Sequence, residues 1–430
     1  MNAPRSFLLA TWEGGGSVPP VLDLARRLAE RGHHVRVMSD ACNRPESEAA
    51  GARFIAWTRA PSKPQRSREF DTWDDWSQAN PAEGFANLMQ NVLVGPALAF
   101  AQDLSEELRR EPADLVVSSE MLFGVHMGCE ALGQRHVLLG VNIPLFPLPG
   151  FIPLGPGLKP ARTVAERALH AEAAAMNEAM LAASLPELNA ARAALNLAPI
   201  ARMLDQHGAA DAQFIATARA FDFAPATLPA KICYVGPLLG EPAWAGVWRS
   251  PYAAGDRRPL ALVSFSTTFQ NHAGVLQRVI DAIATLPMKA VVTLGGSIGA
   301  EELRVADNVQ LLASAPHSAV LSDAAIAVTH GGHGTVMKAL AAGKPLIILP
   351  HGRDQEDNAV RVTERGAGLR LDRDADTEAI RAALSKLLLE PAYAHAAEAL
   401  GAAIRREIET SPLLAKLEAL ASTGERVLCR

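Results

Sequence analysis

The chain has 430 residues, more than one hydrophobic core usually supports, so two domains are expected. Hydrophobic residues make up 49% of it and charged residues 20%, a composition typical of globular proteins. Lys and Arg number 41 against 46 Asp and Glu, and the resulting net charge of −5 argues against a nucleic-acid-binding protein.

In the first half, short apolar runs alternate with amphipathic stretches, which is the pattern of βαβ units in a parallel sheet. Strands are predicted at residues 6–11, 34–39, 114–119 and 136–141. Helices are predicted at residues 18–31 and around 123–132. A stretch rich in Pro and Gly, residues 144–160, leads into a long Ala-rich helical region that ends near Leu195.

A second alternating series follows residues 234–255, a segment rich in Pro, Gly and Trp that we expect to link two domains. The strands predicted in this second series are residues 260–266, 289–295, 309–314, 325–330 and 345–350. Helical segments are predicted at the end of the chain, from Thr377 to about Ala421. The predicted fold class is α/β, with two doubly wound, Rossmann-like domains facing each other across a cleft. In such sheets ligands bind beyond the carboxyl ends of the strands.

No apolar run approaches the roughly 20 residues that a membrane-spanning helix needs. The apolar stretch at residues 7–10 is too brief for a signal peptide. The scattered cysteines have neither metal-ligand nor disulfide-framework spacing; they are Cys42, Cys129, Cys233 and Cys429. We therefore expect reduced thiols, a cytoplasmic protein, a monomer or homodimer, and no nucleic-acid or membrane partner.

The strongest motif lies where a predicted strand ends at His330 and runs into Gly331-Gly332-His333-Gly334-Thr335 before a helix. A turn of small residues that opens a helix leaves backbone N–H groups unpaired at the positive end of the helix dipole. This arrangement predicts an anion site, to which Thr335 and His330 can add side-chain donors. The glycines alone fit a tight structural turn equally well, and His330 at the strand end favours ligand binding.

The next predicted strand ends in His351-Gly352-Arg353-Asp354-Gln355. An adjacent carboxylate and amide at a strand end suit a ligand with many hydroxyl groups. Asp354 alone could simply cap the following helix. Its position one strand away from the predicted anion site favours a ligand-binding role.

The run VTHGGHGTVMKALAAGKPLIILPHGRDQEDNAVRVTERGAG resembles the donor-binding signature of family-1 inverting glycosyltransferases of the GT-B fold. The resemblance is strongest to bacterial members that glycosylate macrolides, aromatic polyketides and flavonoid-like compounds. RRPLALVSFSTTFQ, YVGPL and LLASAPHSAVLSDAAIAVTH resemble further segments of the family, and so do PPVLDLARRLAERGHHV, ADLVVSSEMLFG and NIPLFPLPG in the first half. The resemblance therefore covers nearly the whole chain.

The resemblance implies an acceptor-binding domain at residues 1–235, a linker at 236–256 and a donor-binding domain at 257–405. Residues 406–430 would form a helix that packs back on the first domain. In the donor site, His330, Gly332 and the backbone of Gly334 and Thr335 would hold the diphosphate. Asp354 and Gln355 would hold the sugar, Ser266 and Thr267 would approach the phosphates or nucleoside, and Ala315 and His317 would border the base.

Two departures from the family leave the donor nucleotide open between UDP and dTDP. Many relatives have Glu where Lys338 stands, and that carboxylate holds the ribose hydroxyls, whereas Lys accepts no hydrogen bond. Where many relatives stack an aromatic ring on the base, this chain has Ser314, so base packing must come from elsewhere.

A third departure concerns the catalytic base. Relatives place His or Asp three residues before a Pro in the first loop, where this chain has Ser17, and the orienting Asp is replaced by Ser119. A serine hydroxyl is too weak a base to act unaided. Two carboxylates lie nearby, Glu13 and Glu120, and partial burial can raise a carboxyl pKa toward neutrality. Glu13 is the preferred base, and a structural role for it is equally open.

The expected reaction is single-displacement transfer with inversion to a hydroxyl of a small apolar acceptor. No metal or cofactor is expected, because no carboxylate cluster has metal-ligand spacing. The predicted acceptor contacts are aromatic residues, although core packing is the commoner role for any one of them; they are Trp73, Trp76, Phe85, Phe146 and Phe151. Two alternatives remain at this point: a sugar-nucleotide epimerase, and a catalytically silent nucleotide-sugar-binding accessory protein.

Overall fold

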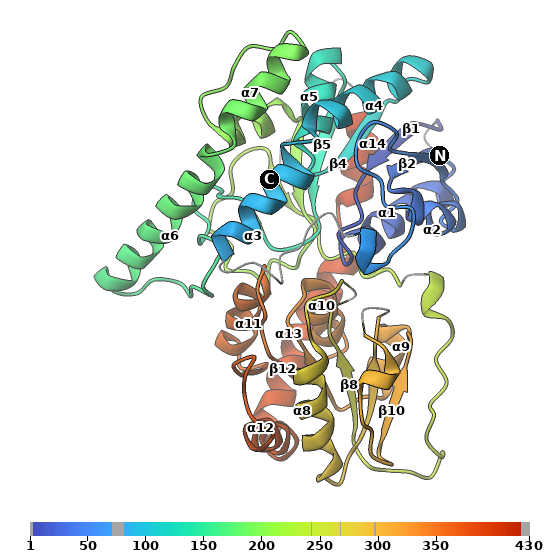
Figure 1. Cartoon of the computed structure of the whole chain (residues 1–430), viewed down its shortest axis with the longest axis vertical. Coiled ribbons are helices and arrows are strands. Elements are labelled where there is room, and N and C mark those ends of the chain that lie inside the picture. The colour runs from blue at the N-terminus through green and yellow to red at the C-terminus, as the bar shows by residue number, and fades with distance from the viewer. Residues whose placement is uncertain (1–2, 71–80, 242, 267, 296–297, 423–430) are drawn as a thin grey trace.

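The computed structural model describes residues 3–70, 81–241, 243–266, 268–295 and 298–422. The described residues form two α/β lobes, each built on one parallel sheet, with the first lobe above the second in Figure 1. The prediction of two doubly wound domains is therefore confirmed.

Within the described residues, the first sheet has seven parallel strands in the order β3-β2-β1-β4-β5-β6-β7. These strands are β1 (Ser6–Ala10), β2 (His34–Ser39), β3 (Arg53–Ala56), β4 (Leu115–Ser119), β5 (His136–Gly140), β6 (Ala212–Ile215) and β7 (Ile232–Tyr234). The helices of this half are α1 (Val18–Glu30), α2 (Arg44–Ala49), α3 (Pro81–Leu88), α4 (Ala97–Arg110), α5 (Phe123–Leu132), α6 (Val164–Ala182) and α7 (Leu185–Ala194).

Both faces of the first sheet are buried, because side chains alternate between the faces along each strand. In β1, Leu8 and Ala10 join the core packed by α4 and α5, while Phe7 and Leu9 join the core packed by α1. The near-continuous apolar pattern that predicted this strand reflects burial on both sides.

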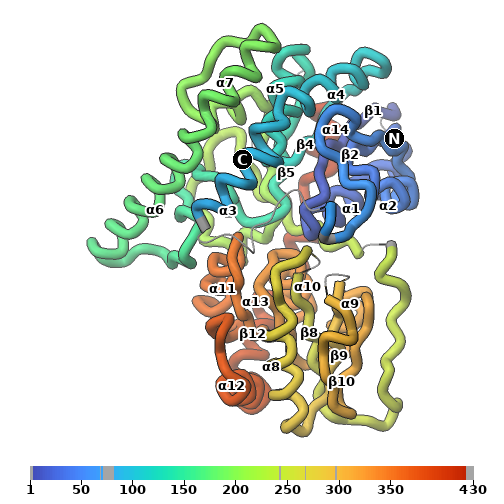
Figure 2. The backbone as a smooth tube through the Cα atoms, viewed as in Figure 1, coloured from blue at the N-terminus to red at the C-terminus, as the bar shows by residue number. Residues whose placement is uncertain are grey.

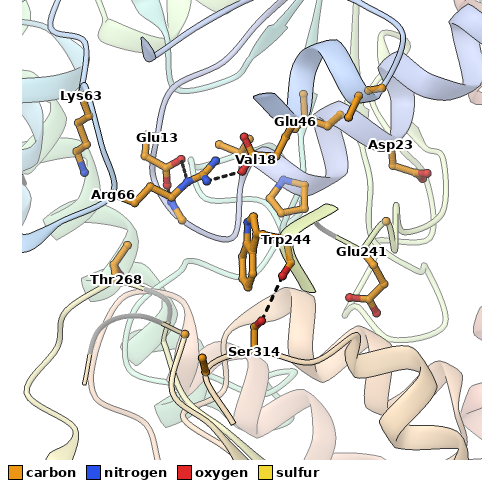
Figure 3. Close-up of a pocket in the computed structure, with 18 of the residues that line it drawn as sticks. Glu13, Val18, Asp23, Glu46, Lys63, Arg66, Glu241, Trp244, Thr268 and Ser314 are labelled. Atoms are coloured by element: carbon orange, nitrogen blue, oxygen red, sulfur yellow. Dashed lines mark hydrogen bonds and ion pairs between the residues drawn. The ribbon is translucent and has the colours of Figure 1, made fainter. Parts of the chain in front are cut away.

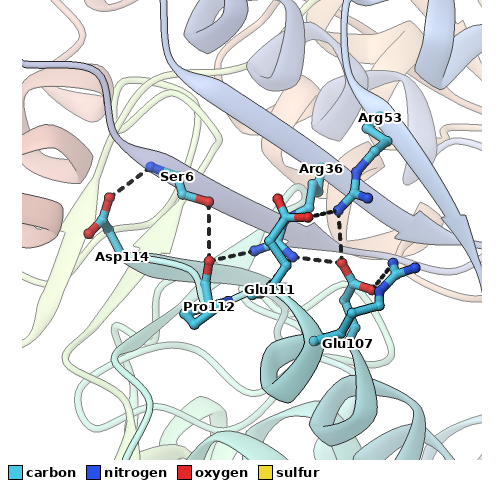
Figure 4. A network of polar contacts seen from close by, with 8 residues as sticks. Ser6, Arg36, Arg53, Glu107, Glu111, Pro112 and Asp114 are labelled. Carbon is cyan, nitrogen blue, oxygen red and sulfur yellow. Dashed lines mark hydrogen bonds and ion pairs between the residues drawn. The ribbon is translucent and has the colours of Figure 1, made fainter.

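An ion pair at the edge of this sheet fixes α4 to β2 (Figure 4). Arg36 of β2 donates to Glu107 of α4 at 2.6 Å, and both side chains are almost fully buried. Arg53 of β3 also donates to Glu107, at 3.1 Å. Removing one member of such a pair leaves a buried charge uncompensated, so these three residues act together in holding the edge of the sheet.

The second sheet has, among the described residues, six parallel strands in the order β10-β9-β8-β11-β12-β13. They are β8 (Leu260–Ser264), β9 (Lys289–Thr293), β10 (Val309–Leu312), β11 (Ile326–Thr329), β12 (Leu346–Ile348) and β13 (Gly368–Arg370). The surrounding helices are α8 (Ala273–Ala284), α9 (His317–Asp323), α10 (His333–Ala341), α11 (Gln355–Glu364), α12 (Thr377–Leu389) and α13 (Pro391–Glu409). The predicted strands of both sheets match within about two residues, whereas β3, β6, β7 and β13 were not predicted.

The chain crosses between the lobes twice. The first crossing follows β7 and contains the short helix η5 (Ala243–Ala245), and the second leads from α13 to α14 (Leu413–Ser422). Figure 2 shows α14 among the first elements of the chain, beside β4. Leu413, Leu417 and Leu420 join the core that contains Phe7, and Glu418 pairs with Arg31 at 2.8 Å.

Cys42 and Cys129 are free thiols, whereas Cys233 is disulfide-bonded, so the expectation of reduced thiols throughout is wrong. The cytoplasmic location of the protein, which was inferred partly from the expectation of reduced thiols, stays a prediction. Among the described residues, the segment Ala82–Arg110 is long and apolar enough to span a bilayer by length and composition. Half of its most apolar 18-residue window is buried, and Phe100 and Leu104 pack in the first core.

Candidate functional site

The turn between β11 and α10 has the geometry of an anion site. Gly331 adopts a φ of 101°, and a Cβ there would lie 2.7 Å from Ile348, so the turn requires glycine. Gly332 occupies the N-cap position of α10, and the first-turn N–H groups of the helix follow at His333, Gly334 and Thr335. Gly334 is exposed with open space where a side chain would stand, so an anion can approach the backbone closely.

His330 lies beside this turn as a neutral imidazole. Its residue is 8% exposed, and burial lowers its pKa to about 3, with nearby His351 and Arg353 acting in the same direction. A Cβ at Gly332 would lie 2.6 Å from His330 Nε2, so the ring rests directly against the helix N-terminus. His330 can therefore offer a hydrogen bond to an anion but no positive charge at neutral pH.

Asp354 and Gln355 follow β12 at the same edge of the sheet. Asp354 stands at the N-cap position of α11 without making the side-chain cap bond, and it accepts instead from Asn358 Nδ2 at 2.9 Å. Burial raises the pKa of its carboxyl group. Gln355 is buried, accepts from the His351 N–H at 2.6 Å and donates to Gln270 at 3.2 Å. Its amide thus supports the loop in this structure, while Asp354 retains unused acceptor capacity.

The loop after β8 approaches this site from the neighbouring strand. Ser266 Oγ lies 2.9 Å from Thr268 Oγ1, which accepts a hydrogen bond from Arg353 at 3.0 Å. The sequence analysis gave no role to Arg353, although a positively charged side chain at this edge of the sheet is direct evidence for an anion site. The predicted contact Thr267 lies outside the described residues.

Ala315 and His317, predicted to border a base, follow β10. Ala315 is buried in the second lobe's core. His317 begins α9, and its Nε2 lies 3.1 Å from Thr293 Oγ1 and 3.3 Å from Ser264 Oγ. Burial lowers the pKa of His317 to about 4. The neutral ring therefore ties the ends of β8 and β9 to the start of α9.

A cavity of about 1060 Å³ opens between the two lobes (Figure 3). Its first-lobe wall comes from α1, α2 and the loops after β1 and β3, and includes Glu13 and Arg66. Its second-lobe wall includes Thr268, Gly295 and Ser314, which follow three neighbouring strands. A cavity of this volume between two lobes is typical of a small-molecule site.

Glu13 lies on the cavity wall, and both of its carboxylate oxygens already accept hydrogen bonds. Gly15 N–H donates to Oε1 at 2.9 Å, and Arg66 Nε donates to Oε2 at 3.0 Å. Arg66 also binds Glu46. Ser17 is the N-cap residue of α1, and its buried hydroxyl has no hydrogen-bond partner within the described part of the chain. The pairing of Glu13 with a residue 53 positions away was not visible in the sequence.

Glu120 follows β4 and is almost completely buried, with 3% of its surface exposed. Gln213 Nε2 donates to its Oε2 at 3.1 Å, while Oε1 has no hydrogen-bond partner among the described residues. Burial raises the pKa of Glu120 to about 7. Ser119, beside it, accepts a weak bond from Met121 N–H at 3.4 Å. A carboxyl group with a pKa of about 7 suits a general base in neutral solution.

The predicted acceptor residues have different environments. Phe146 is 5% exposed and packs edge-on against Phe123, with ring centroids 5.7 Å apart, so it belongs to the first core. Phe85 of α3 is half-buried against the same core, and Phe151 stacks on Tyr234 at 6.3 Å. Trp73 and Trp76 lie outside the described residues.

The described residues contain no group of three or more His, Cys, Asp or Glu side chains placed to hold a metal ion. The cavity does contain two linker residues that sequence analysis did not single out, Glu241 and Trp244. In the sequence, the high Trp content of the linker was the one feature that indicated Trp244, and no feature indicated Glu241.

Comparison with known proteins agrees with this architecture. Residues 277–420 match the family described as the erythromycin biosynthesis protein CIII-like, C-terminal domain. The 4'-demethylrebeccamycin synthase of Lentzea aerocolonigenes is 27% identical over 402 residues, covering 91% of this chain and 93% of that protein. The aklavinone 7-beta-L-rhodosaminyltransferase of Streptomyces galilaeus is 35% identical over 159 residues, or 37% of this chain and 35% of that protein.

Solved structures share the whole fold. The glycosyltransferase of kitacinnamycin superposes with a TM-score of 0.76 at 20% identity, covering 98% of this chain and 100% of that one. The calicheamicin glycosyltransferase CalG4 gives a TM-score of 0.75 at 23% identity, with the same coverage. The two-lobed arrangement is therefore common to this chain and those enzymes.

Proposed function

We propose that the chain is a family-1, nucleotide-sugar-dependent glycosyltransferase of the GT-B fold, and that it transfers its sugar with inversion to a hydroxyl of a small apolar acceptor. The observation that carries the proposal is the N-terminus of α10, with neutral His330 beside it, at the sheet edge that faces the other lobe. The diphosphate of the donor binds there, and Asp354 holds the sugar one strand away.

This arrangement stabilises the leaving group. Negative charge builds up on the diphosphate as the bond to the anomeric carbon breaks. The first-turn N–H groups of α10 and the His330 imidazole are already oriented toward that position, so little reorganisation is needed. Arg353, held against Thr268, adds a fixed positive charge at the same edge.

We assign the removal of the acceptor proton to Glu120 rather than Glu13. A pKa of about 7 lets Glu120 accept a proton near neutral pH, and its Oε1 has no partner within the described structure. Glu13 is instead held by Arg66 and Gly15. Glu120 is 3% exposed, and a Cβ at Gly140, the last residue of β5, would lie 2.9 Å from it, so an acceptor reaches this carboxylate only if the packing around it opens.

The proposed acceptors are phenolic or polyketide compounds. Two relatives carry the names of such compounds, rebeccamycin and aklavinone. A phenol loses its proton more readily than an alkyl alcohol, which suits a site with serine at positions 17 and 119 and one buried carboxylate.

The test is a mass-spectrometric screen of UDP- and dTDP-sugars against a mixed panel of phenols and macrolides. The expected result is a product heavier than one acceptor by one sugar, formed only with the intact chain and a donor. The matched control is Thr335→Val, which removes a donor at the α10 N-terminus while keeping a β-branched side chain. Absence of product across the panel, together with donor binding by calorimetry, would contradict the proposal.

A further inference from the structure

The carboxyl edge of the second sheet forms one continuous track. The anion site follows β11 and Asp354 follows β12, while the cavity floor is made by residues that follow β8, β9 and β10. Neighbouring strands lie about 4.8 Å apart, so β8 to β10 extend the track by about 10 Å on the side away from Asp354. A donor with its diphosphate at α10 and its sugar at Asp354 therefore places its nucleoside in the cavity.

A nucleobase needs a flat apolar surface there, and position 314 provides only a hydroxyl. Ser314 Oγ donates at 3.2 Å to the main-chain carbonyl of Trp244, a residue of η5 in the linker. Trp244 lines the cavity, and 43% of its surface is exposed. Figure 3 shows its indole within the cavity, between Val18 of the first lobe and Ser314 of the second.

The linker is fixed to the donor-binding lobe next to this indole. Glu241 accepts from the Ser318 N–H at 2.7 Å and from Lys338 Nζ at 2.8 Å. Ser318 lies in the first turn of α9, and Lys338 lies in α10, the helix whose N-terminus forms the anion site. The position of Trp244 is thus set relative to the diphosphate site, and Lys338 serves this purpose where relatives have a carboxylate.

Resting on the proposed function, we propose that the indole of Trp244 is the surface on which the base of the donor nucleotide stacks. The linker supplies the ring that the loop after β10 lacks. Phe269 is the other aromatic side chain among the described cavity residues, but it follows β8, next to the diphosphate site. Trp244 contacts the loop after β10, where the far end of the nucleoside lies.

Calorimetric titration of the full-length protein with UDP, dTDP and inorganic pyrophosphate tests this assignment. Stacking of a base on an aromatic ring contributes a free energy that corresponds to roughly a 5- to 150-fold change in affinity. Trp244→Ala is expected to raise the Kd of the tighter-binding nucleotide at least about fivefold, whereas Trp244→Phe, which keeps a ring, retains most of the affinity. The affinity for pyrophosphate is expected to be unchanged in both variants.

Val247→Ala is the matched control, because Val247 lies in the same linker, is 86% exposed and is absent from the described cavity wall. Unchanged nucleotide affinity in Trp244→Ala would overturn the assignment and leave the proposed function intact. Loss of affinity in Phe269→Ala alone would also overturn it. A wild-type protein that binds neither nucleotide would overturn the proposed function itself, and this inference with it.

Discussion

At the residue scale, the chemistry of proton removal depends on one buried carboxyl group. Glu120→Gln keeps the shape and the hydrogen bond with Gln213 but cannot accept a proton. General-base catalysis contributes about 10²- to 10⁴-fold, so kcat with a phenolic acceptor is expected to fall by at least about 100-fold. In the wild type, kcat/KM is expected to rise with pH through about 7, because the base must be ionised.

Glu13→Gln is the companion variant for that measurement. Its carboxylate is engaged by Arg66, so its replacement is expected to weaken the cavity wall and change KM more than kcat. Steady-state kinetics of both variants over pH 5 to 9 separate the two roles. A large loss of kcat in Glu13→Gln, with a kcat near that of the wild type in Glu120→Gln, would show that Glu13 is the catalytic base.

Burial of Glu120 also predicts a pH dependence of stability. The folded state holds this proton up to about pH 7, whereas an ordinary Glu releases it near 4.5. The stability contribution is therefore complete below about pH 4.5 and is lost as the pH rises through 7, by about 3 kcal/mol. Urea denaturation should show Glu120→Gln gaining stability relative to the wild type between pH 5 and pH 8, and a constant difference would contradict this.

The sequence identified individual site residues unevenly, for a physical reason. The positions of His330, Gly332 and Asp354 at the carboxyl edge of the sheet could be predicted because each lies in the loop after an apolar strand, and position after a strand is a local property. The hydrogen-bond partners of Glu13 and Gln355 could not be predicted. Arg66, the partner of Glu13, lies 53 positions away in the sequence, and Gln270, the partner of Gln355, lies 85 positions away. Contacts of this kind depend on tertiary packing, which no local pattern encodes.

At the element scale, the N-terminus of α10 and the His330 ring form one unit. Gly332→Ala fits the backbone conformation, with φ −59° and ψ 133°, but its Cβ would lie 2.6 Å from His330 Nε2. The imidazole must therefore move. Removing one such preorganised donor lowers kcat about 10²- to 10³-fold, and we expect a loss in that range in kcat/KM.

The control for this prediction is Gly255→Ala, where no atom lies within 4 Å of the added methyl group and φ is not positive. Both variants are assayed for transfer and for folding by circular dichroism. Wild-type kcat/KM in Gly332→Ala would contradict the role given to His330.

Elements with strong local signals were predictable, and those that depend on neighbouring strands were not. The strand–turn–helix of β11 and α10 combines a buried apolar run with a glycine turn, and its position was predicted closely. β7 and β13 have three residues each, too few to show a period, and they form by pairing with β6 and β12. The short helix η5, which holds Trp244 in the cavity, gave no periodic signal for the same reason.

At the scale of the whole molecule, a buried ion pair joins the lobes. Arg361 of α11 donates to Asp222 of the first lobe at 2.8 Å, and both residues are at most 4% exposed. Asp222→Ala leaves the guanidinium buried without this partner, which typically destabilises by about 3–5 kcal/mol. We expect a lower thermal unfolding midpoint and weaker donor binding.

Asp372→Ala is the matched control, because Asp372 pairs with Arg370 at 2.6 Å but is 78% exposed. Such a surface pair contributes at most about 1 kcal/mol, so the midpoint should hardly change. Equal midpoints for the two variants would show that the Asp222 pair does not hold the lobes together. The sequence predicted both lobes but not this contact, which joins positions 139 residues apart.

The reaction proposed for this protein is inverting transfer of a sugar from a nucleotide donor bound at α10. The most direct measurement is the anomeric configuration of the product, read by proton NMR from the coupling constant after turnover with an α-linked donor and a phenolic acceptor. The wild type is expected to form a β-linked glycoside, and Gly332→Ala is expected to form the same product much more slowly. An α-linked product would contradict this expectation.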